Sequence, residues 1–172
     1  RPSTSLRRRN VLSLSYLGYF DAIRSVAVDA GGYVYVLDED QEAVSVFNPD
    51  GRFRTWIRGG TRDFKDVVAV GVSGNGNVYV LESEGPNVHI VSPQGSPVAS
   101  HRRLSSRPDV SIDEAADMTV LDNGDFLIVD RDDSRVTHFN RAGDAIGTFG
   151  GEGRPGRGVF GEAGRLAVAA GA

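Results

Sequence analysis

The sequence contains no cysteine, a single lysine and no long apolar run. The absence of cysteine excludes disulfides, catalysis by a thiolate and zinc sites with cysteine ligands. No apolar stretch approaches the roughly 18 to 20 residues that a membrane helix requires, so we expect no membrane span in this chain. Lys65 is the one lysine among 19 basic residues, and this bias, together with 22 glycines, indicates a GC-rich bacterial genome.

Positive charge is also scarce outside the N-terminal segment. The chain has a net charge of −4, and four arginines within residues 1–10 leave −8 on the remaining 162 residues. This balance argues against a body that binds nucleic acid. We interpret residues 1–10 as a flexible basic segment, with a binding arm for an acidic surface as the alternative. Because the chain begins with Arg1, we expect it to be a processed or excised piece.

What the sequence does contain is one pattern repeated three times, over residues 26–51, 68–95 and 118–143. Each copy has three β-branched apolar runs separated by turns of Gly, Asn, Asp or Pro. The glycines that end the copies lie 44 and 48 residues apart, and a fourth copy begins within residues 165–172. A period of this size is typical of a repeat architecture.

Each copy predicts four antiparallel strands. The first apolar run is composed of small residues, which predicts a strand buried on both faces. A fourth strand is predicted after the last turn of the copy, clearest at 52–57 and 145–149. Four antiparallel strands per 40 to 50 residues form one blade of a β-propeller, and no segment of ten residues or more has helical periodicity. The fold class is therefore all-β.

We predict an incomplete propeller ring with three full blades plus flanking strands. Three blades are fewer than the roughly four to eight that close a ring, so we expect the rest of the same polypeptide or another chain to complete it. The predicted units are the basic segment 1–10, an outer strand of a preceding blade with its connector (11–20), blade 1 (21–62), blade 2 (63–112), blade 3 (113–161) and the inner strand of a further blade (162–172).

The third copy resembles the NHL repeat, which occurs in β-propellers that usually have six blades. The matching positions are Asp130, Arg135, Val136, Phe139, Asn140 and Gly143. The first copy keeps Asp38 but has Ala43 in place of the arginine, and the second copy has Glu82 and Asn87 at these two positions. The resemblance spans about residues 11–172. For a bacterial chain it also implies an extracytoplasmic location, either periplasmic or membrane-associated.

Three functions are compatible with this resemblance. The leading prediction is a non-catalytic scaffold that mediates protein–protein interaction within a larger assembly. The first alternative is a metal-dependent enzyme of the lyase or lactonase type, with its active site completed by missing blades. The second is RNA binding, which the negative charge disfavours. The inner strands offer few polar side chains beyond Asp29 and Thr119, so we predict no catalytic residue, no metal ligand and no cofactor in this chain.

One histidine departs from the repeat. His138 aligns with Val46 and Ile90, so a polar ring takes the place of an aliphatic side chain. It is either a satisfied, half-exposed histidine or a ligand or acid–base group near a blade interface. Together with Asp29 it forms the candidate polar inner or interface site.

The loops alternate in charge. The turns at 38–42, 82–86 and 130–134 are acidic, and the connectors between copies are basic. We expect both on one face, where they either pair locally or orient a partner. Trp56 and Phe64 flank the first connector and are interpreted as aromatics packed between blades. The predicted partner-binding residues are Arg102, Arg103, Arg107 and Asp109 in and before the longest connector, with Arg58 and Arg62 in the first one.

Overall fold

A computed structural model describes residues 20–59, 64–102, 104, 110 and 112–151. In this part of the chain the secondary structure consists of three four-stranded antiparallel sheets, in each of which the strand order follows the sequence. The first sheet, blade 1, contains β1 (Ile23–Val28), β2 (Val34–Asp38), β3 (Ala43–Phe47) and β4 (Phe53–Ile57). Over the same residues, no helix is long and apolar enough to cross a membrane.

The second and third sheets repeat this plan. Blade 2 contains β5 (Val67–Val72), β6 (Val78–Glu82), β7 (Asn87–Val91) and β8 (Pro97–His101). Blade 3 contains β9 (Ala115–Val120), β10 (Phe126–Asp130), β11 (Arg135–Phe139) and β12 (Ala145–Gly150).

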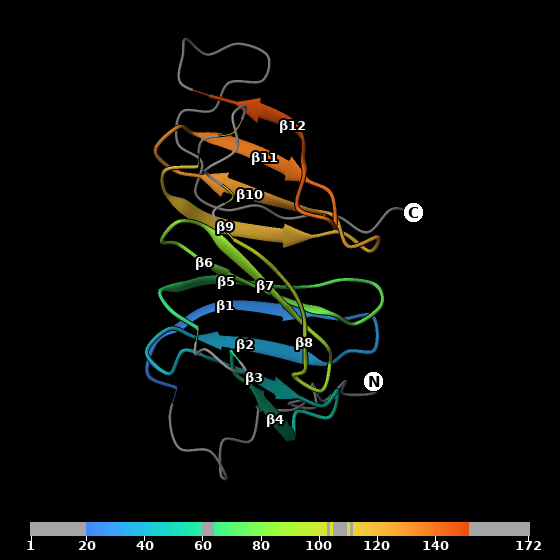
Figure 1. Cartoon of the computed structure of the whole chain (residues 1–172). Helices are drawn as coiled ribbons and strands as arrows, with labels where there is room; N and C mark the ends of the chain where they lie inside the picture. The colour runs from blue at the N-terminus through green and yellow to red at the C-terminus, as the bar shows by residue number, and fades with distance from the viewer. Residues whose placement is uncertain (1–19, 60–63, 103, 105–109, 111, 152–172) are drawn as a thin grey trace, which may run out of the picture.

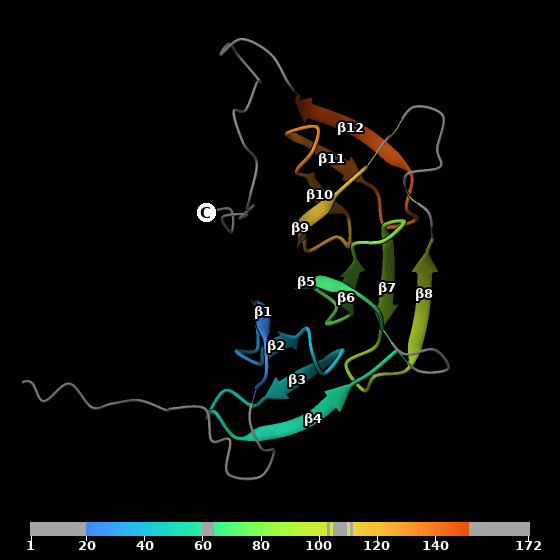
Figure 2. The ribbon, with the colours of Figure 1, turned by 90° about the vertical axis from the view of Figure 1, so that its left-hand side faces the viewer.

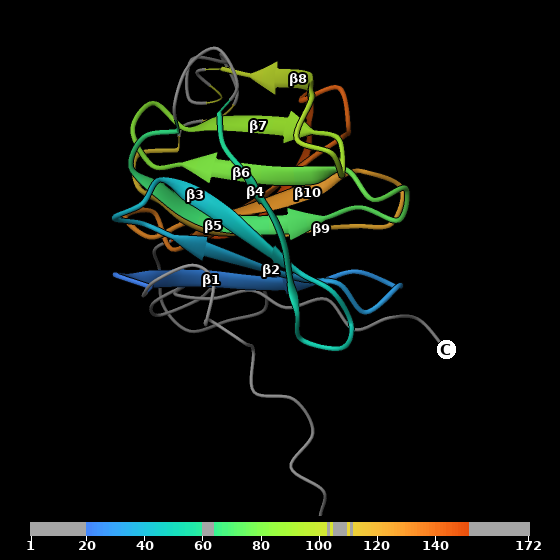
Figure 3. The ribbon, with the colours of Figure 1, turned by 90° about the horizontal axis from the view of Figure 1, so that it is seen from below.

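The three sheets stack side by side as blades (Figure 1). The first strands β1, β5 and β9 line one side of the stack, and the last strands β4, β8 and β12 lie on the opposite rim (Figure 2). In the view from below, the inner strand β1 and the outer strand β8 lie at opposite edges of the stack of sheets (Figure 3). Strand β5 contacts both β1 and β9, so blade 2 lies between the other two. The all-β prediction of an incomplete propeller with three four-stranded blades is confirmed.

Period-two alternation in the second strands builds two cores at once. Successive side chains of a strand point to opposite faces of the sheet. In β6, Val78 and Val80 pack into the core shared with blade 1, whereas Tyr79 and Leu81 pack into the core shared with blade 3. Every residue of β6 is therefore buried.

The glycine that ends each repeat occupies the same turn in every blade. Gly51, Gly95 and Gly143 have φ values of 84°, 84° and 81°, in the left-handed region that favours glycine. Each donates its N–H to the carbonyl three residues earlier, at 2.8 Å. The turn between the third and fourth strands thus depends on glycine at this position.

The first strand of blade 1 differs from the prediction. Ile23, Val26 and Val28 are 56%, 55% and 60% exposed, so the expectation of a strand buried on both faces is wrong for β1. It is closer to correct for β5, where four of six residues are buried. The difference arises because β5 lies between β1 and β9, whereas β1 has a described inner strand on one side only.

The inner strands of blades 2 and 3 approach each other closely. A Cβ added at Gly71 of β5 would lie 2.5 Å from Cγ2 of Val120 in β9. Next to this contact, the N–H of Gly74 donates to the carbonyl of Asp122 at 3.0 Å and joins the hairpin turns of the two blades. The seam has no space for a side chain at position 71.

We predict that Gly71→Ala destabilises the protein by about 1–3 kcal/mol, the usual range for overpacking a well-packed site. Gly147→Ala is the matched control, because a Cβ at Gly147 meets nothing within 4 Å. The free energy of unfolding from urea titration measures both changes. Equal stability of the two variants would contradict the tight seam.

Candidate functional site

A buried carboxylate fastens each blade to the connector that precedes it. Asp38, Glu82 and Asp130 end the second strand of their blades and are 1%, 7% and 0% exposed. Each accepts hydrogen bonds from backbone N–H groups just before or near the start of the first strand. The donors are Asp21 (2.8 Å) and Ala22 (3.3 Å) for Asp38, Lys65 (2.9 Å) for Glu82, and Asp113 (3.1 Å) and Glu114 (3.2 Å) for Asp130. The first acid of each acidic turn is therefore structural.

Backbone hydrogen bonds hold the same turns against the same connectors. The N–H of Glu39 donates to the carbonyl of Ala22 at 2.8 Å, and the equivalent bonds in blades 2 and 3 are both 2.9 Å. The acidic turns and the connectors therefore lie side by side, as the sequence predicted. Two ion pairs act locally within a blade, but neither joins an acidic turn to a basic connector. Arg24 of β1 pairs with Glu39 of the turn, and Arg131 of the turn pairs with Glu114 of the connector.

Blade 2 carries a variant of this carboxylate. Nε2 of His89 lies 3.0 Å from Oε1 of Glu82, and the Asn87 amide donates to Oε2 at 2.9 Å. Burial raises the pKa of Glu82, but His89, Asn87 and the N–H of Lys65 outweigh it and bring that pKa below its usual value. The centroids of the His89 and Phe64 rings lie 5.5 Å apart.

Sequence reasoning singled out His138 and passed over His89. The sequence did contain a signal for His89, because two positions of the second copy depart together from the other copies. The second copy alone replaces aspartate by Glu82, and it alone places a histidine where the other copies have Ser45 and Thr137. The longer acid reaches a partner that the other two blades lack.

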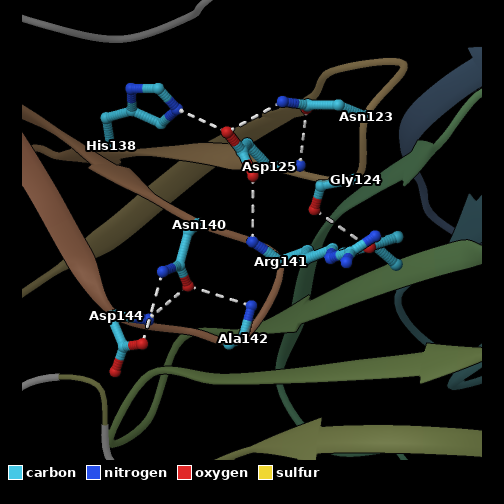
Figure 4. Close-up of polar contacts among 9 residues, drawn as sticks. Asn123, Gly124, Asp125, His138, Asn140, Arg141, Ala142 and Asp144 are labelled. Carbon is cyan, nitrogen blue, oxygen red and sulfur yellow. Dashed lines mark hydrogen bonds and ion pairs between the residues drawn. The ribbon is translucent and has the colours of Figure 1, made fainter.

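His138, at the predicted site, lies in β11 next to turns of blade 3 (Figure 4). Nε2 of His138 lies 3.6 Å from Oδ2 of Asp125. Asp125 also accepts hydrogen bonds from the Asn123 amide at 2.9 Å and from the N–H of Arg141 at 3.0 Å. The hydroxyl of Tyr79 in blade 2 donates to the carbonyl of Gly124 at 3.0 Å. The contacts of Asp125 thus join two turns of blade 3, and Tyr79 ties them to blade 2.

Asp29, the other half of that predicted site, lies in the first turn of blade 1. Its carboxylate accepts hydrogen bonds from the N–H of Tyr33 at 2.9 Å and from the hydroxyl of Tyr35 at 3.1 Å. Burial first, and then the bond to Asp29, raise the pKa of Tyr35 to about 12. Blade 2 separates Asp29 from His138, so the structure does not bring these two residues together.

The inner strands line an open trough of about 880 Å³. Its walls are mainly aliphatic side chains of β1, β5 and β9, with charged groups from Arg24, Asp117 and Arg131. Asp117 accepts the N–H of Met118 at 2.9 Å. Within the described ranges, no group of three or more His, Asp or Glu side chains could hold a metal ion. Sequence reasoning missed Arg24 because the first copy was taken to begin at residue 26, whereas β1 begins at Ile23 and carries a β-bulge between Ile23 and Ser25.

Two of the predicted partner-binding arginines can be placed. Arg58 and Arg102 are both exposed, and Arg58 lies over the ring of Trp56 with its guanidinium carbon 5.7 Å from the ring centroid. Trp56 is 41% exposed on the face of blade 1 that no described sheet covers, so its packing between blades stays a prediction, whereas Phe64 is fully buried as predicted. The remaining predicted residues, Arg62, Arg103, Arg107 and Asp109, lie outside the described residues.

Comparison with solved structures identifies the fold. The chain aligns with hydrazine synthase of Kuenenia stuttgartiensis at a TM-score of 0.58 and 10% identity, covering 76% of this chain and 36% of that one. It aligns with virginiamycin B lyase from Staphylococcus aureus at a TM-score of 0.54 and 14% identity, covering 77% of this chain and 42% of the lyase. It aligns with the WD40 repeats of RRP9 at a TM-score of 0.58 and 13% identity, covering 76% of this chain and 39% of that one. These neighbours support a β-propeller.

The same comparisons do not fix a function. The chain spans less than half the length of these structures, and identities this low show the fold alone. The propeller fold is shared by an enzyme, the lyase, and by a protein of WD40 repeats. No protein family and no curated protein matches the chain, so the assignment to NHL repeats stays a prediction.

We predict that Glu82→Gln lowers the free energy of unfolding at pH 7 by about 1–3 kcal/mol, because the amide leaves its buried partners imperfectly paired. The pKa of Glu82 is lowered on folding. Its stabilisation is therefore present above the unfolded pKa of about 4.3 and is lost as pH falls through the lower folded pKa. The stability difference from the wild type should accordingly shrink below about pH 4.

Glu84→Gln in the same turn is the matched control, because Glu84 is exposed. Urea unfolding of the three proteins at several pH values measures the effect. A difference for Glu82→Gln that stays constant from neutral to acid pH would contradict the role of its charge.

Proposed function

We propose that the chain is a non-catalytic β-propeller scaffold that binds another protein within a larger assembly. The observation that carries the proposal is the exposed pair of Trp56 and Arg58 where blade 1 meets its connector. Tryptophan and arginine are among the residues most enriched in the centres of protein–protein interfaces. Here they lie at the end of a paired strand, which presents them on a rigid element.

The distribution of polar groups supports the same function. The buried acids Asp38, Glu82 and Asp130 bind connector backbone, and Asp29 and Asp125 bind turns of their own blades. These side chains stabilise the frame. The exposed arginines of the connectors belong to loops on that frame, where binding residues concentrate.

We also propose that the ring is completed by the rest of the same polypeptide or by another chain, in an extracytoplasmic compartment of a bacterium. The partial coverage of the solved propellers supports the first part. A metal-dependent lyase or lactonase is the competing function, and its ligands would come from residues beyond those described. Stoichiometric calcium or zinc in the purified full-length protein would favour that enzyme.

The interaction function predicts a loss of partner binding when the connector arginines are removed. Arg58→Ala combined with Arg102→Ala should reduce capture of the partner at least about tenfold, the effect of losing one interface hot spot. The measurement is affinity capture from a lysate of the source organism, with quantitative mass spectrometry of the retained proteins.

Arg141→Ala is the control, since Arg141 is an exposed arginine in the turn between β11 and β12, at the other end of the strands. This control should capture as much partner as the wild type. The proposal fails if the double variant retains the same proteins in the same amounts.

A further inference from the structure

The outer strand of blade 1 has an unusual charge. Arg52, Arg54, Trp56 and Arg58 are all exposed, while the residues between them are partly or fully buried. Strand β4 itself contains Arg54, and Arg52 and Arg58 flank it directly, whereas β8 (PVASH) and β12 (AIGTFG) contain no arginine and have one arginine directly beside them, Arg102 after β8. Blade 1 therefore has a cationic, aromatic outer strand where blades 2 and 3 have neutral or weakly basic ones.

Within the described residues, Phe53–Ile57 also has an unpaired edge. Among the described strands, β4 pairs with β3 alone, so one row of its backbone N–H and C=O groups faces outward. Edge strands of this kind are templates for an added strand. Pro97 begins β8 and Gly147 interrupts β12, and both residues weaken a strand as a template. The segment 52–57 contains neither proline nor glycine.

Aromatic rings fix two of the guanidinium groups. Arg54 lies over Tyr33 with its guanidinium carbon 4.8 Å from the ring centroid, and Arg58 lies over Trp56 at 5.7 Å. A stacked guanidinium keeps its N–H groups at its edges, in the planar arrangement that binds a carboxylate with two hydrogen bonds.

The two stacked arginines, Arg54 and Arg58, lie on opposite faces of the blade 1 sheet. Tyr33 packs against the core between blades 1 and 2, whereas Trp56 pairs with Ser45 and contacts Phe53 on the other face. A bulge beside Phe53 in β4 accompanies this change of face. A strand added to this edge would therefore meet arginine on both of its sides.

We propose that the unpaired edge of β4 binds an extended acidic peptide segment by strand addition, with Arg52, Arg54 and Arg58 pairing with its carboxylates. This inference rests on the proposed protein-binding function and names the chemistry of the partner. The backbone of β4 supplies the main-chain hydrogen bonds, and the arginines select acidic side chains. The pair of Arg52 with Asp50, at 3.7 Å, is exposed and screened by solvent, so Arg52 remains available to a ligand.

The same geometry disfavours a nucleic acid. Single strands bind by stacking bases on aromatic faces. The guanidinium groups of Arg54 and Arg58 already cover faces of the Tyr33 and Trp56 rings. The chain also carries a net charge of −4, which repels a phosphate backbone outside this strand.

The test uses a fluorescein-labelled peptide of seven glutamates, which presents carboxylates on both faces when extended. It is titrated with the full chain and followed by fluorescence anisotropy. Arg52→Gln with Arg54→Gln should weaken binding at least about tenfold, because each lost charge-assisted contact accounts for a large share of affinity. Arg141→Gln, on a distant turn, should leave binding unchanged. Thermal unfolding of each variant shows whether the fold is retained.

A second peptide tests strand addition itself. N-methylation of every second residue removes the N–H groups that would pair with β4, and it should weaken binding at least about tenfold while the charge is unchanged. Equal binding of the two peptides would overturn strand addition, and so would unchanged binding by the double variant. Tighter binding of an oligouridylate than of the peptide would assign the strand to nucleic acid instead.

These outcomes are separable from failure of the scaffold function. If capture of the cellular partner depends on Arg58 and Arg102 but the peptide does not bind, the scaffold stands and the inference about β4 falls. If the peptide binds and no partner is captured, the edge is competent and the scaffold function falls.

Discussion

The structure depends on one constraint: a four-stranded sheet with two apolar faces needs a neighbour on each face. Strand β6 meets this requirement fully, because its alternating side chains enter the cores on both sides of blade 2. The close approach of Gly71 to Val120 and the hydrogen bond from Tyr79 to Gly124 follow from that packing. Where a described neighbour is missing, as beside β1, valines stay exposed.

The buried carboxylates accept hydrogen bonds from connector backbone that the same packing brings close to the core. A stack of sheets leaves connectors crossing from the outer strand of one blade to the inner strand of the next, with backbone N–H groups near the core. Asp38, Glu82 and Asp130 satisfy these groups at the same position in each blade. Acidic turns that look like surface charge in the sequence are thus partly internal, and the exposed arginines proposed for recognition lie on the outer strand of blade 1 and on the connectors.

The sequence predicted the features that repeat. Period-two apolar runs and the turn glycines at Gly51, Gly95 and Gly143 indicate strands and hairpins, because both depend on local backbone geometry. It could not predict the features that depend on a neighbouring sheet. The exposure of Val26 and of Trp56 is set by what packs across a blade face. The pairing of His89 with Glu82 did leave a signal in the sequence, the coupled change in the second copy.

Amide hydrogen exchange of the full chain tests most directly whether packing between blades holds this frame together. The second strands β2, β6 and β10 occupy equivalent places, each paired along both edges. Since β6 alone has a described sheet against both of its faces, its amides should exchange most slowly, through opening of the whole stack. Equal exchange rates in the three strands, or faster exchange in β6, would contradict the account.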